Sequence, residues 1–216
     1  MFTEVTDFVE VYQSVNLDCE SIIDWFNNNK NIQTSGIIYR DTKSLVDTET
    51  KDTKDICLSL AHIKNDEDVA KLFYSLFSNI SLAFKQYIEK YNILDDVSME
   101  IDDNFNIQYY TKGQHFKKFH FESSGATHRK RILTWMVYLN DVPKGGHTVF
   151  PYYDYTIQPI KGHILIWPAE FTHTHFGDVV EDDKYIVTGW FNIVERNQYF
   201  AERPKVSEEQ VVYFNV

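Results

Sequence analysis

The sequence predicts an α+β protein in which a double-stranded β-helix, or jelly roll, is supported by N-terminal helices packed on one sheet. All five prolines and seven of the eight glycines lie beyond residue 100, where tight turns between short strands require them. Before residue 100, apolar residues recur at the three- and four-residue spacing of amphipathic helices. We therefore expect a single domain over residues 1–216, with mainly helical support in 1–100 and the jelly-roll core in 105–193.

Two helices are predicted in the N-terminal part. Asn16 or Asp18 can cap the first helix, and its apolar stripe consists of Cys19, Ile22, Ile23 and Phe26. The second helix starts near residues 65–68, where four acidic or amide side chains suit the positive end of a helix dipole. Its stripe consists of Val69, Leu72, Phe73, Leu76, Phe77, Ile80, Ala83, Tyr87 and Ile88. Both stripes are interpreted as packing surfaces against a sheet.

Short apolar runs between turns predict the strands of the core. The runs are Ile107–Tyr110, Phe116–Phe121, Ile132–Leu139, Thr148–Phe150, His163–Trp167 and Tyr185–Ile193. Regular short strands punctuated by Gly and Pro are typical of a double-sheet jelly roll, whose open end is lined by inward side chains. The run Ile132–Leu139 is apolar on both faces, so we expect a central strand there. Residues 39–54 are polar and lack a period, which predicts an exposed loop.

Composition excludes several classes of function. The formal net charge of −11 argues against nucleic acid as a bulk electrostatic partner. A local basic cluster is interpreted as a solvated rim, and it consists of Lys112, Lys117, Lys118, Arg129, Lys130 and Arg131. The sequence contains no predicted signal peptide or membrane span, so we expect a cytoplasmic location. Cys19 and Cys57 are expected to be reduced, and two cysteines exclude a thiolate-rich metal site.

A candidate metal site combines His120, Glu122 and His175. Side chains two residues apart on a strand point to the same face, so His120 and Glu122 can converge on one ion. His175 would join them from a distant part of the chain. Two imidazoles and one carboxylate leave the opposite side of the ion open, which is the arrangement expected of non-haem Fe(II) oxygenases.

Lys184 is the candidate anion-binding residue. A polar stretch, residues 177–183, predicts a turn after His175, and an apolar strand follows it. In a hairpin this strand would return beside the His175 strand and bring Lys184 near the metal. A lysine on an inward face needs an anionic partner, because burial of an unpaired ammonium is costly. A dicarboxylate cosubstrate would supply one.

Residues 105–193 resemble the prolyl 4-hydroxylase-like branch of the 2-oxoglutarate/Fe(II) dioxygenases. The matching stretches are Tyr110–Gly113, His120–Glu122, Arg131–Thr134 with Tyr138–Asn140, Gly145–Pro151, Pro159–Gly162, His175–Gly177 and Lys184–Ile186 with Trp190. They occur in the order found in the family. This chain departs from the family at Glu122, where the carboxylate ligand is more often Asp.

The resemblance implies a role for each matching residue. His120, Glu122 and His175 fall at the positions of the catalytic iron ligands. Lys184 falls where a residue pairs with the distal carboxylate of 2-oxoglutarate, and Tyr110 where a tyrosine contacts this cosubstrate. Thr148 and Trp190 would line the same cavity. The implied cofactors are Fe(II), 2-oxoglutarate as cosubstrate, and O2, with ascorbate as an optional reductant. The family also implies that residues 39–54 form a lid over the substrate.

Other interpretations of these residues stay open. His173 competes with His175, because residues two apart on a strand face the same way. Trp190 and Thr148 fit packing as well as ligand contact. The remaining histidines have no place in a motif and are interpreted as surface or structural residues: His62, His115, His128, His147 and His163.

The function implied by the resemblance is hydroxylation of a substrate C–H with release of succinate and CO2, favouring a prolyl residue in a peptide or protein. Another amino acid, a small molecule or a nucleobase is an alternative substrate, and Tyr152, Tyr153 and Tyr155 could stack on rings near the mouth. A noncatalytic jelly-roll binding module is a second class of function. We expect no membrane partner, and the sequence does not predict an oligomeric state.

Overall fold

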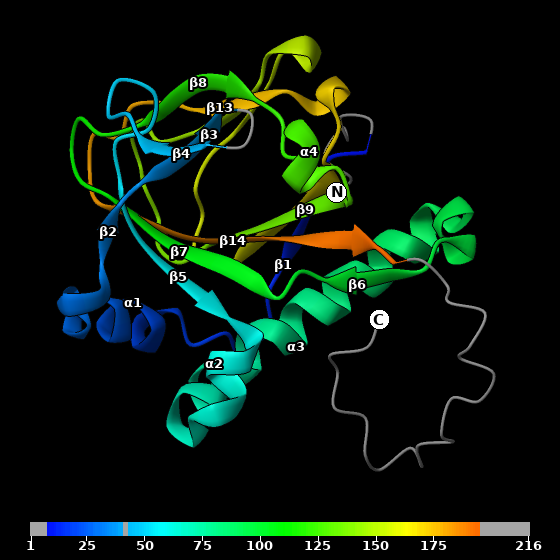
Figure 1. The fold of residues 1–216 in the computed structure, drawn as a ribbon, viewed down its shortest axis with the longest axis horizontal. Coiled ribbons are helices and arrows are strands. Elements are labelled where there is room, and N and C mark those ends of the chain that lie inside the picture. The colour runs from blue at the N-terminus through cyan, green and yellow to red at the C-terminus, as the bar shows by residue number, and fades with distance from the viewer. Residues whose placement is uncertain (1–7, 41–42, 195–216) are drawn as a thin grey trace.

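Two antiparallel sheets form the core of the computed structural model, which describes residues 8–40 and 43–194. The larger sheet consists of β1 (Glu10–Gln13), β2 (Thr34–Ser35), β5 (Lys54–Ser59), β6 (Met99–Ile101), β7 (Asn104–Tyr110), β9 (Arg131–Tyr138), β12 (His163–Pro168) and β14 (Lys184–Ile193). The smaller sheet consists of β8 (Phe116–His120), β10 (Thr148–Phe150), β11 (Tyr155–Ile157) and β13 (His175–Gly177). This two-sheet arrangement is the predicted jelly roll (Figure 1).

The larger sheet has the strand order β1-β12-β9-β14-β7-β5-β2, with β6 also paired to β14, and the smaller sheet has the order β11-β10-β13-β8. Strand β9 therefore lies between β12 and β14, as its two apolar faces predict. The predicted strands all form, within a few residues of the expected bounds. The alternation of side chains gives each sheet one face toward the other and one face away.

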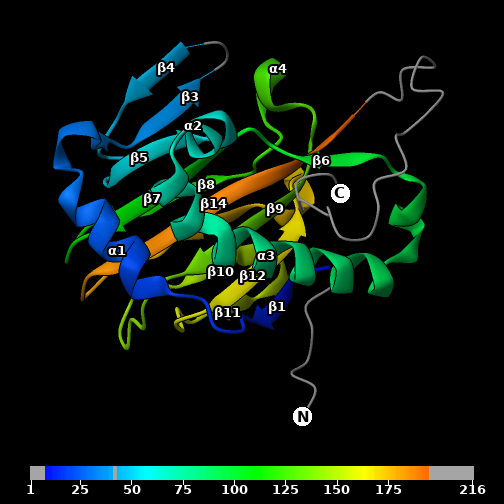
Figure 2. The ribbon, with the colours of Figure 1, turned by 90° about the horizontal axis from the view of Figure 1, so that it is seen from below.

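Helices cover the outer face of the larger sheet. They are α1 (Cys19–Asn28), α2 (Leu60–Asn65) and α3 (Glu67–Lys90), while the short α4 (Gly125–His128) follows β8. Asp18 caps α1, and its carboxylate accepts a hydrogen bond from the Ser21 amide at 3.1 Å. Figures 1 and 2 show α1 and α3 packed on one side of the sheet, opposite β8 and β13.

Two apolar clusters hold these layers together. The first joins the helices to the larger sheet, with Phe26 and Phe77 among its buried residues on the helices and Val137 on β9. The second lies between the two sheets and includes Tyr138, Phe150 and Ile186. Because burial of apolar surface stabilises by roughly 25 cal/mol per Å², these clusters fix the two sheets at the spacing that frames the cleft described below.

Beside its predicted helices, the N-terminal part also contributes strands. β1 pairs with β12 and β5 pairs with β7, so this part extends the larger sheet on both sides. The predicted polar loop over residues 39–54 is partly wrong. β3 (Ile37–Arg40) and β4 (Lys43–Val46) form an antiparallel hairpin. The polar side chains of this segment do not follow the apolar alternation that predicts a strand. They are tolerated in a strand because β4 is largely exposed. Residues 41–42 lie outside the described residues.

The predicted hairpin between the His175 strand and the Lys184 strand is wrong. β13 belongs to the smaller sheet, whereas β14 belongs to the larger one, so residues 178–183 cross from one sheet to the other. Lys184 still faces the interior, because its cross-strand partner is Tyr110 on β7. None of the helices among the described residues combines the length and apolar character that a membrane crossing requires.

Candidate metal centre and anion pocket

A cleft of about 790 Å³ opens between the two sheets. Inward side chains of β7, β9 and β14 form its floor, and residues of β8 and β13 form its opposite wall. All seven residues predicted to form the site line it: Tyr110, His120, Glu122, Thr148, His175, Lys184 and Trp190. The structure therefore brings together residues that are up to 80 positions apart in the chain, from 110 to 190.

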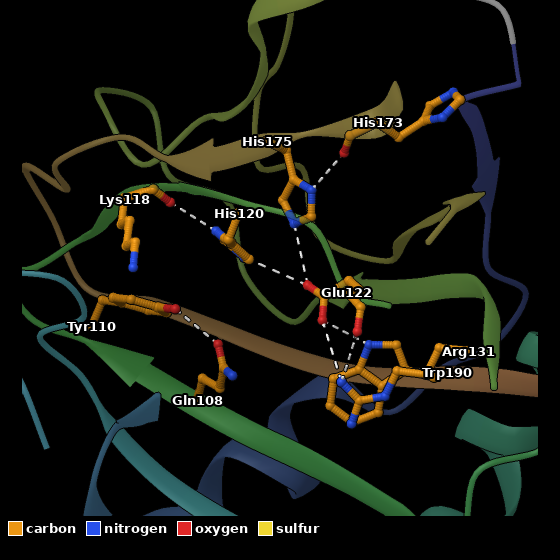
Figure 3. A network of polar contacts seen from close by, with 9 residues as sticks. All are labelled: Gln108, Tyr110, Lys118, His120, Glu122, Arg131, His173, His175 and Trp190. Carbon is orange, nitrogen blue, oxygen red and sulfur yellow. Dashed lines mark hydrogen bonds and ion pairs between the residues drawn. The ribbon is translucent and has the colours of Figure 1, made fainter. Parts of the chain in front are cut away.

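His120, Glu122 and His175 meet at one point of this cleft. β8 and β13 are antiparallel, and His120 lies directly opposite His175 in their register. Glu122 follows β8, and its Oε1 lies 3.5 Å from Nε2 of His120 and 3.3 Å from Nε2 of His175. One potential ligand atom from each residue lies within 4.8 Å of the other two. Figure 3 shows the three side chains converging.

The backbone fixes the tautomer of both imidazoles. Nδ1 of His120 lies 2.8 Å from the carbonyl oxygen of Lys118, and Nδ1 of His175 lies 3.0 Å from that of His173. A carbonyl oxygen only accepts, so each Nδ1 carries a proton and donates it. In the neutral ring the lone pair then lies on Nε2, which faces Glu122, whereas a ring that also carries a proton on Nε2 can donate to Oε1 of Glu122. Such outer hydrogen bonds orient a histidine as a metal ligand.

Aromatic packing holds the two rings in place. Phe116 stacks on His120 with ring centroids 3.9 Å apart and an interplanar angle of 13°. Trp167 meets His175 edge to face at 5.1 Å. These contacts restrict the rotamers of both histidines, so the site is preorganised by packing as well as by hydrogen bonds.

The charge state of the cluster suits a cation. Burial alone would raise the pKa of Glu122, but the imidazoles of His120 and His175 outweigh it, because their protonated forms donate hydrogen bonds to the carboxylate, and they hold this pKa well below its ordinary value. Burial, together with the nearby His175, lowers the pKa of His120. A carboxylate and neutral imidazoles are the protonation states that bind a divalent metal. The donor set of two nitrogens and one oxygen fits Fe(II) with open positions.

The competition between His173 and His175 is decided by backbone conformation. His173 lies in a short 3-10 helix, Phe171–His173, rather than on a strand, so the two-residue alternation does not apply to it. Its ring packs on Tyr153 at a centroid distance of 5.1 Å and lies outside the cluster of potential ligands. His173 contributes through its carbonyl oxygen, which accepts the Nδ1 proton of His175.

Lys184 forms a cationic pocket at another part of the cleft. Its side chain is 4% exposed, and its ammonium donates a hydrogen bond to the carbonyl oxygen of Gly146 at 2.6 Å. Burial lowers the pKa of this ammonium from 10.5 to about 7, and among the described residues Asp178 is the carboxylate whose charge opposes that shift. A buried cation with no carboxylate paired to it in the described chain is suited to bind an anion.

Three hydroxyl-bearing side chains surround Lys184. The Tyr110 and Tyr138 rings lie 5.5 Å and 5.4 Å from its nitrogen. The Tyr138 hydroxyl forms a 2.6 Å hydrogen bond with the Thr148 hydroxyl, and the Tyr110 hydroxyl donates to Gln108 at 2.8 Å. The predicted residues Tyr110 and Thr148 therefore lie at the Lys184 end of the cleft. Tyr138 was not among the predicted site residues, although its alternation with Met136 on β9 places it on the inward face.

Trp190 lies in the cleft but not beside Lys184. They are six positions apart on β14, or about 20 Å at roughly 3.3 Å per residue. Its indole N–H donates to Oε2 of Glu122 at 2.9 Å. The structure therefore groups Trp190 with the candidate metal centre rather than with the candidate cosubstrate pocket. Arg131, which the sequence placed in a solvated rim, stacks on the Trp190 ring (Figure 3).

Other sequence interpretations have mixed outcomes. His147 has the structural role predicted for it, because its ring bridges Asp178 at 3.4 Å and Gln158 at 2.8 Å. The three tyrosines at positions 152, 153 and 155 do not line the described cleft, so that expectation is wrong. Tyr153 packs instead on His173, and Tyr152 is exposed.

Comparison with known proteins finds similarity to one family. Residues 105–192 match the family model of the 2OG-Fe(II) oxygenase superfamily. Prolyl 4-hydroxylase 13 of Arabidopsis thaliana is 26% identical over 69% of this chain and 60% of its own length. The human prolyl 4-hydroxylase subunit alpha-1 is 31% identical over 36% of this chain and 16% of its own length. The chain thus spans less than two thirds of these relatives.

Solved structures share the fold. A prolyl hydroxylase from Trichoplax adhaerens, solved with a peptide fragment of hypoxia inducible factor, has a TM-score of 0.67 at 15% identity and covers 87% of this chain and 84% of its own. The viral collagen prolyl hydroxylase of Paramecium Bursaria Chlorella virus-1 has a TM-score of 0.59 at 15% identity, over 87% of this chain and 97% of its own. The predicted jelly roll is confirmed. Over residues 105–192 the chain is similar to the 2OG-Fe(II) oxygenase superfamily, and the relatives that it resembles include prolyl 4-hydroxylases.

Proposed function

We propose that this chain is a 2-oxoglutarate- and Fe(II)-dependent dioxygenase that hydroxylates a substrate C–H. The observation that carries the proposal is a single cleft that holds two complementary sites. One is a preorganised cluster of His120, Glu122 and His175. The other is the buried Lys184 ammonium, which lacks an ion-paired carboxylate in the described chain. The first suits a divalent metal and the second suits the far carboxylate of a dicarboxylic acid.

Different residues of this chain would bind the metal, bind 2-oxoglutarate and exclude water. Nε2 of His120, Nε2 of His175 and Oε1 of Glu122 would hold Fe(II) and leave its remaining positions open to ligands. Lys184, with the Tyr110, Tyr138 and Thr148 hydroxyls nearby, would bind the distal carboxylate of 2-oxoglutarate. Iron and 2-oxoglutarate together supply an O2-derived oxidant, with succinate and CO2 as products. The apolar wall formed by Phe116, Trp167 and their neighbours would limit water near the reacting C–H.

The favoured substrate is a prolyl residue in a peptide or protein. Support comes from the relatives, several of which are named prolyl 4-hydroxylases, and from the Trichoplax enzyme solved with a peptide. A different amino acid, a small molecule or a nucleobase is the alternative within the same chemistry. Ascorbate is proposed as a reductant that keeps the iron ferrous.

Succinate formation tests the proposed chemistry. Purified protein with Fe(II), ascorbate and 2-oxoglutarate should form succinate slowly even without substrate, and His175→Ala should abolish it. His173→Gln is the matched control, because it changes a neighbouring histidine whose ring lies outside the cluster. Equal succinate from the wild type and His175→Ala would remove the proposal and leave the noncatalytic binding module as the better reading.

A peptide pool tests the proposed substrate class. Mass spectrometry should find a gain of one oxygen on proline-containing peptides that depends on 2-oxoglutarate. Oxygen gain on free amino acids or on oligonucleotides instead would support the alternative. A nucleic-acid substrate would also show binding that weakens steeply with salt, because phosphate contacts release counterions.

The β3–β4 hairpin is proposed to close over the cleft, which keeps the lid hypothesis for residues 39–54. Support comes from Ile37 and Ile38 of β3, which line the cleft although the hairpin pairs with neither main sheet. Limited proteolysis should slow in this region when metal, 2-oxoglutarate and a true substrate are all present. Cleavage that is unchanged by these ligands would contradict a lid.

A further inference from the structure

The two carboxylate oxygens of Glu122 have different surroundings. Oε1 faces the Nε2 atoms of both histidines at 3.5 Å and 3.3 Å. Oε2 points the other way and accepts a hydrogen bond from the Trp190 indole N–H at 2.9 Å. Figure 3 shows the carboxylate between these two groups. One oxygen therefore belongs to the candidate metal centre, while the other is already engaged by the protein.

Arg131 holds Trp190 in this orientation. The carbon of its guanidinium lies 3.4 Å from the centroid of the Trp190 ring, which is a close stacked cation–π contact. Nη1 of Arg131 also donates to the backbone carbonyl of Glu122 at 3.3 Å and lies 3.7 Å from its Oε2. The stacked planar group blocks one face of the indole, so the ring cannot rotate freely away from the carboxylate.

Asp102 contacts Arg131, Asn192 and the backbone of Trp190. Its carboxylate lies 3.9 Å from Nε of Arg131 and accepts a hydrogen bond from the Asn192 side chain at 3.1 Å. Its backbone N–H donates to the carbonyl oxygen of Trp190 at 2.8 Å. Sheet register makes this possible, because Asn192 of β14 lies opposite Arg131 of β9. The network thus joins β9, β14 and the turn between β6 and β7 to Glu122, which follows β8 of the smaller sheet.

We infer that Trp190 and Arg131 are positioning residues that make Glu122 a one-oxygen ligand. This inference rests on the proposed function. Glutamate has one more rotatable bond than aspartate, so a free Glu122 could present both oxygens to a metal and occupy a position that the cosubstrate needs. The hydrogen bond to Trp190 removes Oε2 from that competition and fixes the longer side chain. This is a role for Trp190 distinct from the cosubstrate contact expected from the sequence.

Trp190→Phe tests the inference. It removes the indole N–H together with the five-membered ring and retains an aromatic ring on which Arg131 can stack. Outer hydrogen bonds to metal ligands typically contribute tenfold or more to affinity, so we expect Co(II) to bind about tenfold more weakly. The intensity of the Co(II) d–d absorption should also change, because a freed Oε2 alters the coordination number. Trp25→Phe is the matched control, since Trp25 packs against Phe73 on the helical side of the larger sheet.

A double-mutant cycle separates this role from general packing. Glu122→Asp shortens the side chain by one methylene, so its carboxylate should no longer reach both the metal and Trp190. In that background Trp190→Phe should leave Co(II) affinity unchanged. A tenfold loss in the Glu122 protein and none in the Glu122→Asp protein supports the inference. The same loss in both backgrounds would mean that Trp190 acts through packing alone and would overturn it.

The outcomes also separate this inference from the proposed function. If the wild type binds neither Co(II) nor Fe(II), the proposed function fails. If the wild type binds Co(II) and Trp190→Phe has the same affinity and the same d–d spectrum, only the positioning role is wrong. Thermal unfolding of the metal-free proteins shows whether each variant is folded, and it is read before the titrations are compared.

Discussion

The two ends of the cleft differ in whether their polar and charged groups have protein partners before any ligand binds. At the metal end, each imidazole donates to a backbone carbonyl and each oxygen of Glu122 has a partner. At the Lys184 end, a buried ammonium has a carbonyl oxygen but no ion-paired carboxylate in the described chain. The metal end is therefore assembled in advance, whereas the Lys184 end carries an unbalanced charge.

This difference predicts where stability and binding oppose each other. A preorganised, hydrogen-bonded cluster costs little to maintain without its ligand. A buried ammonium without a counterion destabilises the fold until an anion arrives. Ligand binding to the Lys184 end should therefore recover free energy that the unliganded protein lacks, and this end should be the more sensitive to pH.

The largest effect is expected from Lys184→Met, which replaces the buried charge by an apolar side chain of similar length. Affinity for 2-oxoglutarate in the metal-loaded protein should fall by about 100-fold or more, because buried charge pairs contribute several kcal/mol. The same change should raise the free energy of unfolding by about 1–4 kcal/mol. Calorimetric titration and urea unfolding measure the two effects. Loss of both binding and stability would contradict the contrast between the two ends.

The stability gain should itself depend on pH. The folded-state pKa of Lys184, about 7, lies below the unfolded value near 10.5. The penalty of the buried ammonium is therefore fully present below about pH 7 and fades as pH rises toward 10.5. The difference in unfolding free energy between Lys184→Met and the wild type should shrink across this range. A difference that stays constant from pH 6 to about pH 9 would show that Lys184 is not buried as an unpaired charge.

The next effect concerns 2-oxoglutarate binding as a function of pH. An anion binds the protonated Lys184, and burial sets its pKa to about 7. Above pH 7, affinity in metal-saturated protein should therefore fall by up to about tenfold per pH unit. Lys184→Arg should flatten this dependence, because a guanidinium stays charged throughout. Parallel pH profiles for the two proteins would assign the titration to another group.

The smallest effect is expected from Tyr138→Phe. This change removes one hydroxyl and leaves the Thr148 hydroxyl without the 2.6 Å hydrogen bond that it has in the structure. A single hydrogen bond contributes about 0.5–1.5 kcal/mol, so 2-oxoglutarate affinity should fall by about 2- to 13-fold. Tyr185→Phe is the matched control on the outer face, where the hydroxyl contacts Asn27. Equal effects of the two variants would place Tyr138 outside the anion pocket.

The candidate ligands could be predicted from the sequence, because their side-chain directions depend on local alternation along a strand. His120 and Glu122 are two residues apart near a strand end, and Lys184 begins an apolar strand, so period-two alternation predicts their inward direction. Strand alternation alone did not separate His173 from His175; Gly177 and the spacing to Lys184 favoured His175, and the 3-10 turn that holds His173 gives no signal in the apolar pattern. Tyr138 was missed because a central strand that is apolar on both faces conceals which face borders the cleft.

The long-range pairings were beyond the sequence for a different reason. The predicted hairpin after His175 failed because turn residues give no information about which sheet receives the next strand. The contacts of Trp190 with Glu122 and Arg131 depend on the register of β14 against β9 and on the distance between the sheets. None of these is set by neighbours in the chain.

By itself, the sequence determined the chemistry available to this protein: the helical stripes, the core strands and a set of two imidazoles, one glutamate and one inward lysine. These follow from side-chain type and local periodicity, which act over a few residues. Only the tertiary structure decided that the lysine has no paired carboxylate among the described residues and that Trp190 engages one oxygen of the glutamate. Both depend on which side chains meet across two packed sheets, and such contacts are fixed by collective packing rather than by any local pattern.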